Sequence, residues 1–114
     1  MTQLNFGRDV QGMNAYAPQS STNKYSATLT SGSAASITVP LSSENWIVAF
    51  SYKPGATVWV NMLGATAAVP AGATFAATGS ELNPGQRKVV GGTVISMITS
   101  DTTAAVGISL YAVP

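Results

Sequence analysis

Apolar and polar side chains alternate along most of the chain after residue 22, and this alternation predicts β-strands. In the first such run, Tyr25, Ala27 and Leu29 alternate with serine and threonine, which is typical of a strand with one buried face. Glycine, proline, serine and asparagine residues separate the runs, and no helical period appears. The predicted strands cover residues 24–30, 36–40, 45–52, 57–62, 66–69, 73–78, 86–90, 93–99 and 105–113.

Short strands spaced about 8–12 residues apart are typical of an all-β sandwich or barrel. The chain of 114 residues fits one domain, and no internal repeat indicates a solenoid. We therefore predict an all-β fold, an eight- or nine-stranded antiparallel sandwich that is jelly-roll-like, since a jelly roll has eight strands in two Greek keys. An immunoglobulin-like sandwich is the alternative, because a single sequence does not reveal the order in which strands connect.

Two neighbouring runs carry the two tryptophans. Trp46, Val48 and Phe50 share one face of the first run, and its other face is also partly apolar, which indicates a central strand or a face that meets a partner. Residues 53–55 (Lys-Pro-Gly) have the signature of a type II turn, so we expect the two runs to form a hairpin. We expect Trp46 and Trp59 to serve in packing rather than in ligand binding.

Residues 1–22 differ from the rest of the chain. Their apolar residues follow neither the strand period nor the helix period, and two glycines disfavour a helix. We predict an extended N-terminal arm over 1–22 and a β-sandwich domain over 23–114. Phe6 and Tyr16 are the candidate residues for docking the arm onto a neighbouring subunit. The alternatives are a frayed terminus or a segment folded back on its own domain.

The chain is poor in charge. Charged residues make up 8%, with five basic and four acidic residues and a net charge of +1, whereas ordinary domains carry about 25%. A surface of serine, threonine, alanine and glycine is suited to a protein that is packed against other subunits in an assembly. The alternative is a soluble monomer whose serine and threonine hydroxyl groups keep its surface hydrated. Scattered basic residues argue against nucleic-acid binding, and we expect no membrane span because no apolar run reaches 18 residues.

The residue types needed for most catalytic chemistry are missing. The chain has no cysteine and no histidine, which argues against zinc sites and against Ser-His-Asp or Cys-His nucleophile systems. The four carboxylates are Asp9, Glu44, Glu81 and Asp101, and no motif links them. The last three lie in predicted turns, where we expect them to be solvated. The sequence therefore predicts neither an enzyme nor a bound cofactor or metal.

Two residue pairs are candidates for binding a partner. Arg87 and Lys88 are the only adjacent cations, and they could meet an acidic patch on another protein. They could equally lie in solvent on an edge strand, where lysine discourages unwanted strand pairing. Trp59 and Asn61 share the less apolar face of their strand, and an aromatic ring beside an amide is the alternative candidate for a sugar site.

The C-terminal half carries a resemblance to known proteins. It contains the stretches Val-Trp-Val-Asn, Ala-Ala-Val-Pro-Ala-Gly-Ala-Thr-Phe-Ala-Ala-Thr, Ser-Glu-Leu-Asn-Pro-Gly-Gln-Arg-Lys-Val and Val-Ile-Ser-Met-Ile-Thr-Ser-Asp-Thr-Thr-Ala, all between residues 58 and 113. This region resembles the small jelly-roll-like decoration, or cement, proteins on the capsids of short-tailed double-stranded DNA bacteriophages. The resemblance spans about half of the chain and transfers no individual binding residue.

The resemblance implies a non-enzymatic structural protein on the capsid surface of a virion, made in the cytoplasm of a bacterial host. It implies the major capsid protein as the partner, whose subunits the decoration protein bridges against internal DNA pressure. We also expect a homo-oligomer and no contact with nucleic acid or membrane. The alternative function is a carbohydrate- or receptor-binding sandwich module on a phage tail or fibre, because one fold serves both uses.

Overall fold

The structure is a computed structural model that describes residues 21–75 and 79–113. Within these residues all regular structure is β, and the predicted all-β class is confirmed. Buried and less buried side chains alternate over residues 45–49 and 103–110, as the sequence pattern indicated. Over residues 23–30 only Leu29 is buried, so the buried face predicted there is mostly exposed. The strands are β1 (Asn23–Thr30), β2 (Ala35–Thr38), β3 (Asn45–Tyr52), β4 (Val58–Asn61), β5 (Glu81–Leu82), β6 (Gln86–Val90), β7 (Val94–Thr99) and β8 (Thr103–Val113).

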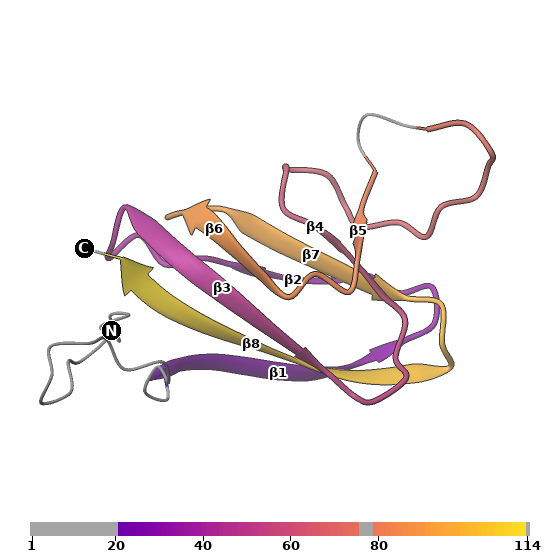
Figure 1. The fold of residues 1–114 in the computed structure, drawn as a ribbon, viewed down its shortest axis with the longest axis horizontal. Coiled ribbons are helices and arrows are strands. Elements are labelled where there is room, and N and C mark those ends of the chain that lie inside the picture. Colours follow the sequence, from indigo (N-terminus) through magenta and orange to yellow (C-terminus); the bar gives the residue numbers. More distant parts are fainter. Residues whose placement is uncertain (1–20, 76–78, 114) are drawn as a thin grey trace, which may run out of the picture.

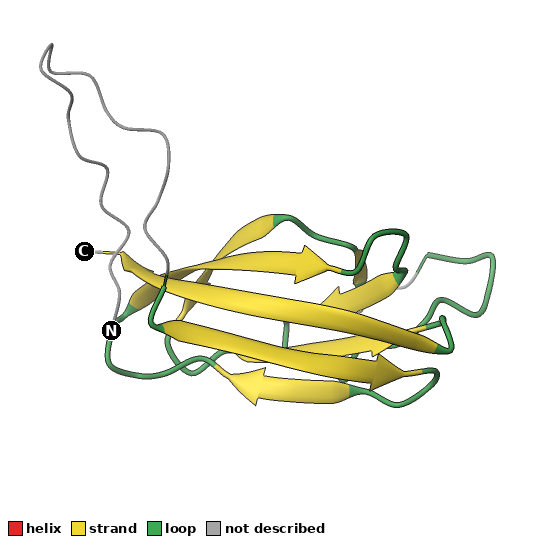
Figure 2. Ribbon diagram, turned by 90° about the horizontal axis from the view of Figure 1, so that it is seen from below, coloured by secondary structure: helices red, strands yellow, loops and turns green. Residues whose placement is uncertain are grey.

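The eight strands form two antiparallel four-stranded sheets that pack face to face (Figures 1 and 2). One sheet has the order β1-β8-β3-β6 and is called the β8 sheet here; the other has the order β2-β7-β4-β5 and is called the β7 sheet. The pairs are nested, with β1 on β8, β2 on β7, β3 on β6 and β4 on β5. This is the strand order of a jelly roll. An immunoglobulin-like sandwich would place its first two strands in one sheet, whereas β1 and β2 lie in different sheets.

The core lies between the two sheets and is built from the inward face of each strand. The face predicted for β3 is confirmed, because Trp46 and Val48 are fully buried and Phe50 packs against them. The indole N–H of Trp46 donates to the carbonyl oxygens of Pro40 (3.1 Å) and Ser43 (3.2 Å), so its polar edge is satisfied inside the core. The largest side chains that are fully buried also include Val39, Val58, Val60, Ile95, Thr99 and Leu110.

The connection between β3 and β4 corrects the predicted hairpin. The type II turn is present, because Gly55 has a φ of +78° and the N–H of Ala56 donates to the Lys53 carbonyl at 3.0 Å. However, β3 and β4 lie in different sheets, so the turn forms a corner of the sandwich. The physical reason is that type II turns splay the flanking strands, whereas two-residue hairpins favour the mirror-image turn types.

The segment between β4 and β5 also differs from the prediction. Residues 66–69 and 73–75 form no strand, and residues 76–78 lie outside the described residues. Instead, the predicted loop 79–85 contains the short strand β5. The alanine-rich sequence before it has little β propensity, and β5 forms where residues 81 and 82 pair with β4.

The described chain begins on the β8 sheet. Ser21 is buried, and its hydroxyl donates to the Leu110 carbonyl of β8 and accepts the N–H of Asn23 at 3.0 Å. The first 20 residues of the predicted arm, including Phe6 and Tyr16, lie outside the described residues.

Candidate functional site

The candidate cations Arg87 and Lys88 lie on β6, the strand at one edge of the β8 sheet. In the pairing with β3, Arg87 lies opposite Val48 and Lys88 lies opposite Ile47. Val48 belongs to the core, so Arg87 lies on the inward side of its strand and Lys88 on the outward side. The two cations are therefore neighbours in sequence but point to opposite faces of one sheet.

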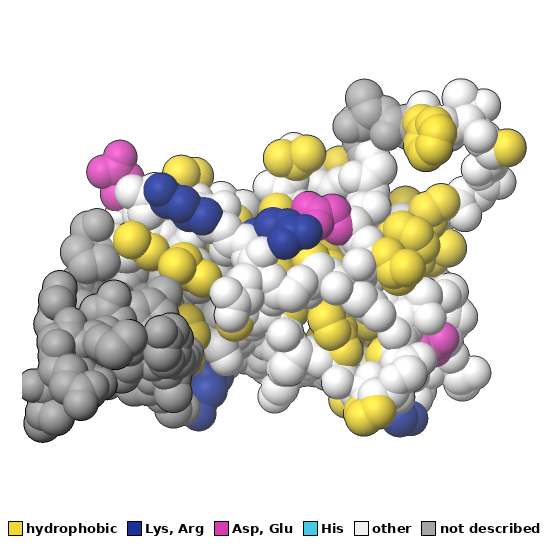
Figure 3. Space-filling view, in the orientation of Figure 1, with side chains coloured by type: hydrophobic (Ala, Val, Ile, Leu, Met, Phe, Trp, Pro, Cys, Tyr) yellow, Lys and Arg dark blue, Asp and Glu magenta, His cyan; other side chains and the backbone are white. Residues whose placement is uncertain are grey.

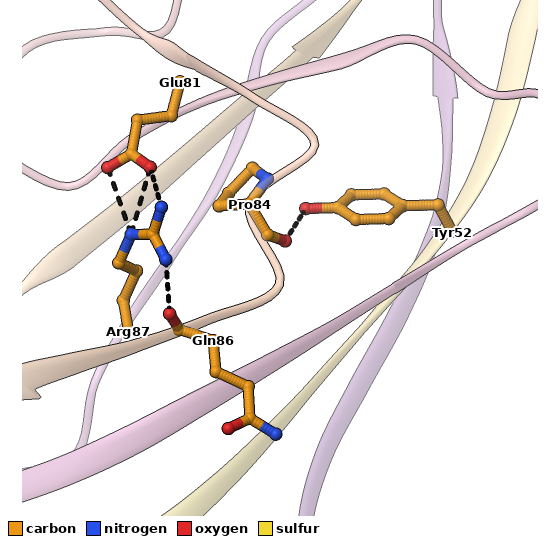
Figure 4. Close-up of polar contacts among 5 residues, drawn as sticks. All are labelled: Tyr52, Glu81, Pro84, Gln86 and Arg87. Carbon is orange, nitrogen blue, oxygen red and sulfur yellow. Dashed lines mark hydrogen bonds and ion pairs between the residues drawn. The ribbon is translucent and has the colours of Figure 1, made fainter.

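Arg87 is engaged with a carboxylate of the same chain (Figure 4). Its Nε lies 3.0 Å and its Nη2 2.5 Å from Oε2 of Glu81, and Nη1 donates to the Gln86 carbonyl at 2.6 Å. The hydrogen bond to Glu81 raises the pKa of the Arg87 guanidinium. Because Glu81 is on β5 and Arg87 is on β6, this ion pair joins the edges of the two sheets. Glu81 is thus paired, not simply solvated in a turn as predicted.

Tyr52 lies next to this ion pair, at the end of β3 (Figure 4). Its hydroxyl donates to the carbonyl oxygen of Pro84 at 2.6 Å, and its ring stacks on Phe50 with the centroids 6.4 Å apart. Burial raises the pKa of Tyr52 above its ordinary value, because the charged phenolate would lose solvation. The contact fixes the β5–β6 turn against the β8 sheet.

Asn83 and Asp101 fix the start of β4 by side-chain hydrogen bonds. Asn83 has a left-handed φ of +44°, and its side chain accepts the N–H of Val58 and donates to the Ala56 carbonyl, both at 2.8 Å. Asp101 accepts the N–H of Thr57 at 2.7 Å. The prediction that Asp101 is solvated in a turn is corrected, because its carboxylate accepts a backbone hydrogen bond. Within residues 21–75 and 79–113, no group of three or more acidic residues is placed to hold a metal ion.

Trp59 and Asn61 lie on the face of β4 that points away from the core, where they pair with Ile98 and Ser96 of β7. The structure places both on one face, as the sequence indicated, but in different surroundings. Asn61 is 2% exposed, and its side-chain oxygen accepts the N–H of Leu63 at 2.9 Å. Trp59 is half-buried and lines a hollow beneath residues 68–75.

The β4–β5 loop is described over residues 62–75 and 79–80, and its part around residue 67 lies against this face. The buried Ala67 donates its N–H to the Ser96 hydroxyl at 2.9 Å, and Ala68 donates to Ser80 at 3.2 Å. The sequence signal was Ser96, the single polar residue within the apolar run 94–98 of β7. A buried hydroxyl needs a partner, and a loop crossing that face supplies one.

The β4–β5 loop projects from the sandwich and carries apolar side chains outward (Figures 1 and 3). Phe75 is fully exposed and Leu63 is 83% exposed. The described part of the loop contains no charged residue. Exposed apolar side chains of this size are suited to contacts with a partner. The strand predicted over 73–78 would have included Phe75, which instead lies in the loop.

The part of the chain that the structure describes contains no helix long and apolar enough to cross a membrane. No protein-family model, no curated protein sequence and no solved structure matches this chain.

Proposed function

We propose that this protein is a non-enzymatic structural protein of a phage virion, which decorates the capsid by bridging subunits of the major capsid protein. The observation that carries the proposal is a jelly-roll sandwich that holds an uncharged loop outward with Leu63 and Phe75 exposed. The resemblance of residues 58–113 to capsid decoration proteins supports it. Jelly rolls occur in viral capsid proteins, although the fold alone does not determine function.

The distribution of charge supports a binding role over a catalytic one. Glu81 and Arg87 neutralise each other, and Asp101 binds a backbone N–H. These side chains are engaged in contacts within the fold. Interface cores are depleted of charge and enriched in aromatic side chains, and the exposed β4–β5 loop has both properties.

Repetition by symmetry supports the proposal energetically. The described part of the loop has three large exposed apolar side chains, Leu63, Val69 and Phe75, and makes a weak contact on its own. When one protein contacts several capsid subunits, each further contact forms at a high effective concentration. Weak single contacts therefore suffice for stable decoration of a particle.

The test is the copy number of this protein in purified virions of the phage that encodes it, measured by quantitative mass spectrometry against the major capsid protein. We expect a number comparable to that of the major capsid protein. A handful of copies per particle would place the protein at the tail or portal and contradict the decoration proposal. Its absence from virions would overturn any structural role in the particle.

A second candidate function is binding of a carbohydrate or receptor, favoured by the half-buried Trp59, which lines a hollow. Sugar rings stack on such aromatic faces. The test is binding of the purified protein to a glycan array before and after Trp59→Ala, with circular dichroism to confirm the fold. Specific binding that the substitution abolishes would support this function, and the absence of any binding to the array would contradict it.

A further inference from the structure

The two open sides of the sandwich differ in chemistry. Between β5 and β6, the ion pair of Glu81 and Arg87 joins the sheets. The hollow that remains there has these two residues and Lys88 in its lining, together with apolar residues such as Val60 and Leu63. Between β1 and β2 lies a slot of about 120 Å³, and none of the described residues that line it is charged. Tyr25, Ala27 and Leu29 of β1 form one wall of this slot, with Ile37, Met97 and Ile108 among the residues that complete it.

The strand beside the slot is also the longest edge strand among the described residues. β1 has eight residues and pairs with β8 alone, in a continuous register from residue 23 to residue 30. It contains no proline and no bulge, and its one charge is Lys24 near its start. The other edge strands are shorter, with five residues in β6, four in β2 and two in β5. Edge strands normally carry charges, prolines or bulges because a bare edge accepts another strand.

We infer that β1 pairs with β1 of a second copy of this chain, antiparallel and across a twofold axis, so that the two β8 sheets become one continuous sheet. A twofold axis perpendicular to the sheet keeps the two β7 sheets on the same side, and the two apolar slots then face each other. The inference is independent of the capsid role, because it concerns only how two copies associate.

The side chains of β1 select the register. Inward residues must lie opposite inward residues, since a shift of one position would exchange the two faces. Centring the pairing on Ala27 places Ala27 opposite Ala27 of the second copy and Tyr25 opposite Leu29, so that apolar side chains meet beside the slots. Lys24 then lies opposite Thr30, and the two copies of Lys24 are roughly 20 Å apart along the ladder, about twice the Debye length at 0.1 M salt.

The size of the contact fits a reversible dimer. Eight residues in a strand span roughly 27 Å, and the side of a two-layer sandwich gives a footprint of about 500 Å² on each copy. The total of roughly 1,000 Å² is at the lower end of specific interfaces. We therefore expect association in the micromolar range in free solution.

The test uses a single introduced thiol, which is unambiguous because the chain has no cysteine. Ala27 is exposed, and directly opposite Cα atoms in an antiparallel pair are 4.5–5.5 Å apart, within the range that a disulfide spans. Under mild oxidation, we expect most of the Ala27→Cys protein to become a covalent dimer on a non-reducing gel. Gln86→Cys places a thiol on the other edge strand of the same sheet and is the matched control, which we expect to stay monomeric.

A second measurement needs no covalent bond. Ala27→Lys places two like charges face to face across the axis, which destabilises strand pairing, and we expect at least a tenfold rise in the dimer dissociation constant by sedimentation equilibrium. Gln86→Lys adds the same charge on β6 and should leave the constant unchanged. A wild-type protein that stays monomeric at millimolar concentration, a dimer that survives Ala27→Lys, or equal cross-linking of the two cysteine variants would each overturn the inference. Cross-linking that appears only after deletion of residues 2–20 would also overturn it, because the edge would then belong to the chain's own N-terminal segment.

Discussion

Gly91, between β6 and β7, occupies a position where the surrounding backbone leaves no room for a side chain. A Cβ atom at this position would lie 2.6 Å from the Ser43 carbonyl oxygen and 3.0 Å from that of Pro40. Both oxygens accept the indole N–H of Trp46, so they are held by the core. We predict that Gly91→Ala lowers the free energy of unfolding by about 2 kcal/mol, because the backbone must move to relieve the clash.

The measurement is urea unfolding followed by tryptophan fluorescence, since Trp46 reports on this part of the core. Gly85→Ala is the control, because a Cβ there meets nothing within 4 Å. We expect this second change to stay within about 0.5 kcal/mol of the wild type. Equal effects of the two substitutions would contradict the account of Gly91.

Tyr52 gives a prediction about pH. Its pKa is raised in the folded state above the value of 10.0 of a free tyrosine, chiefly by burial. The folded protein therefore holds this proton more tightly than the unfolded chain does. The stabilisation is complete below pH 10 and is lost as the pH rises through the region above it.

We predict that Tyr52→Phe lowers the free energy of unfolding by about 1 kcal/mol at neutral pH, through loss of the hydrogen bond to Pro84. The variant should also lose less stability than the wild type above pH 10, because it has no phenol to ionise. Unfolding curves at a series of pH values measure both effects. Tyr25→Phe, at an exposed position, is the control; an unchanged alkaline decline in Tyr52→Phe would refute the assignment.

At the scale of the element, the sequence predicted the strands that have a local signal. The runs 45–52 and 86–90 match β3 and β6 at both ends, because alternation depends only on which face of a strand meets the core. β5 has no such signal. Its two residues become a strand because they pair with Trp59 and Val60, about 20 positions earlier in the chain, and no local pattern records that contact.

In the candidate site, too, features with a local sequence signal were predictable and features that depend on distant contacts were not. Strand alternation alone could have placed Arg87 and Lys88 on opposite faces once β6 was predicted. The partner of Arg87 was beyond the reach of the sequence, because Glu81 comes close only when the two sheets pack. The buried state of Asn61 likewise depends on the β4–β5 loop, which folds over β4 and β7.

We predict that the exposed side chains of the β4–β5 loop form the contact with the capsid. Leu63→Ser together with Phe75→Ser should leave the fold intact, because both side chains are exposed. Binding to capsids that lack the protein should fall at least tenfold, since burying one such side chain stabilises a contact by about 1.5–3 kcal/mol. Co-sedimentation with the capsids measures this. Leu41→Ser removes a leucine that is 82% exposed outside this loop, and an equal loss in that control would show that the loop is not the contact.

At the scale of the whole molecule, the jelly roll follows from pairs that are nested across the chain. β1 meets β8 and β2 meets β7, so the earliest and latest strands depend on each other. The strand count and rhythm predicted a sandwich, but only these long-range pairs distinguish a jelly roll from an immunoglobulin-like order. The same nesting brings Ser21 onto Leu110, so the entry to the first strand is held by the last strand.

Because Ser21 is held by Leu110 of β8, we predict that the sandwich folds without residues 2–20. The truncated chain keeps Ser21 and its contacts with Leu110 and Asn23, and it keeps every strand of both sheets. We therefore expect its free energy of unfolding to stay within about 1 kcal/mol of the full chain. If the arm docks on a neighbouring subunit through Phe6 and Tyr16, the loss of two aromatic contacts at each symmetric site should weaken binding to capsids at least tenfold. Full-length protein with Phe6→Ala and Tyr16→Ala should show most of this loss. A truncated protein that folds and binds as tightly as the full chain would contradict the arm hypothesis, whereas one that no longer folds would place residues 2–20 within the sandwich domain.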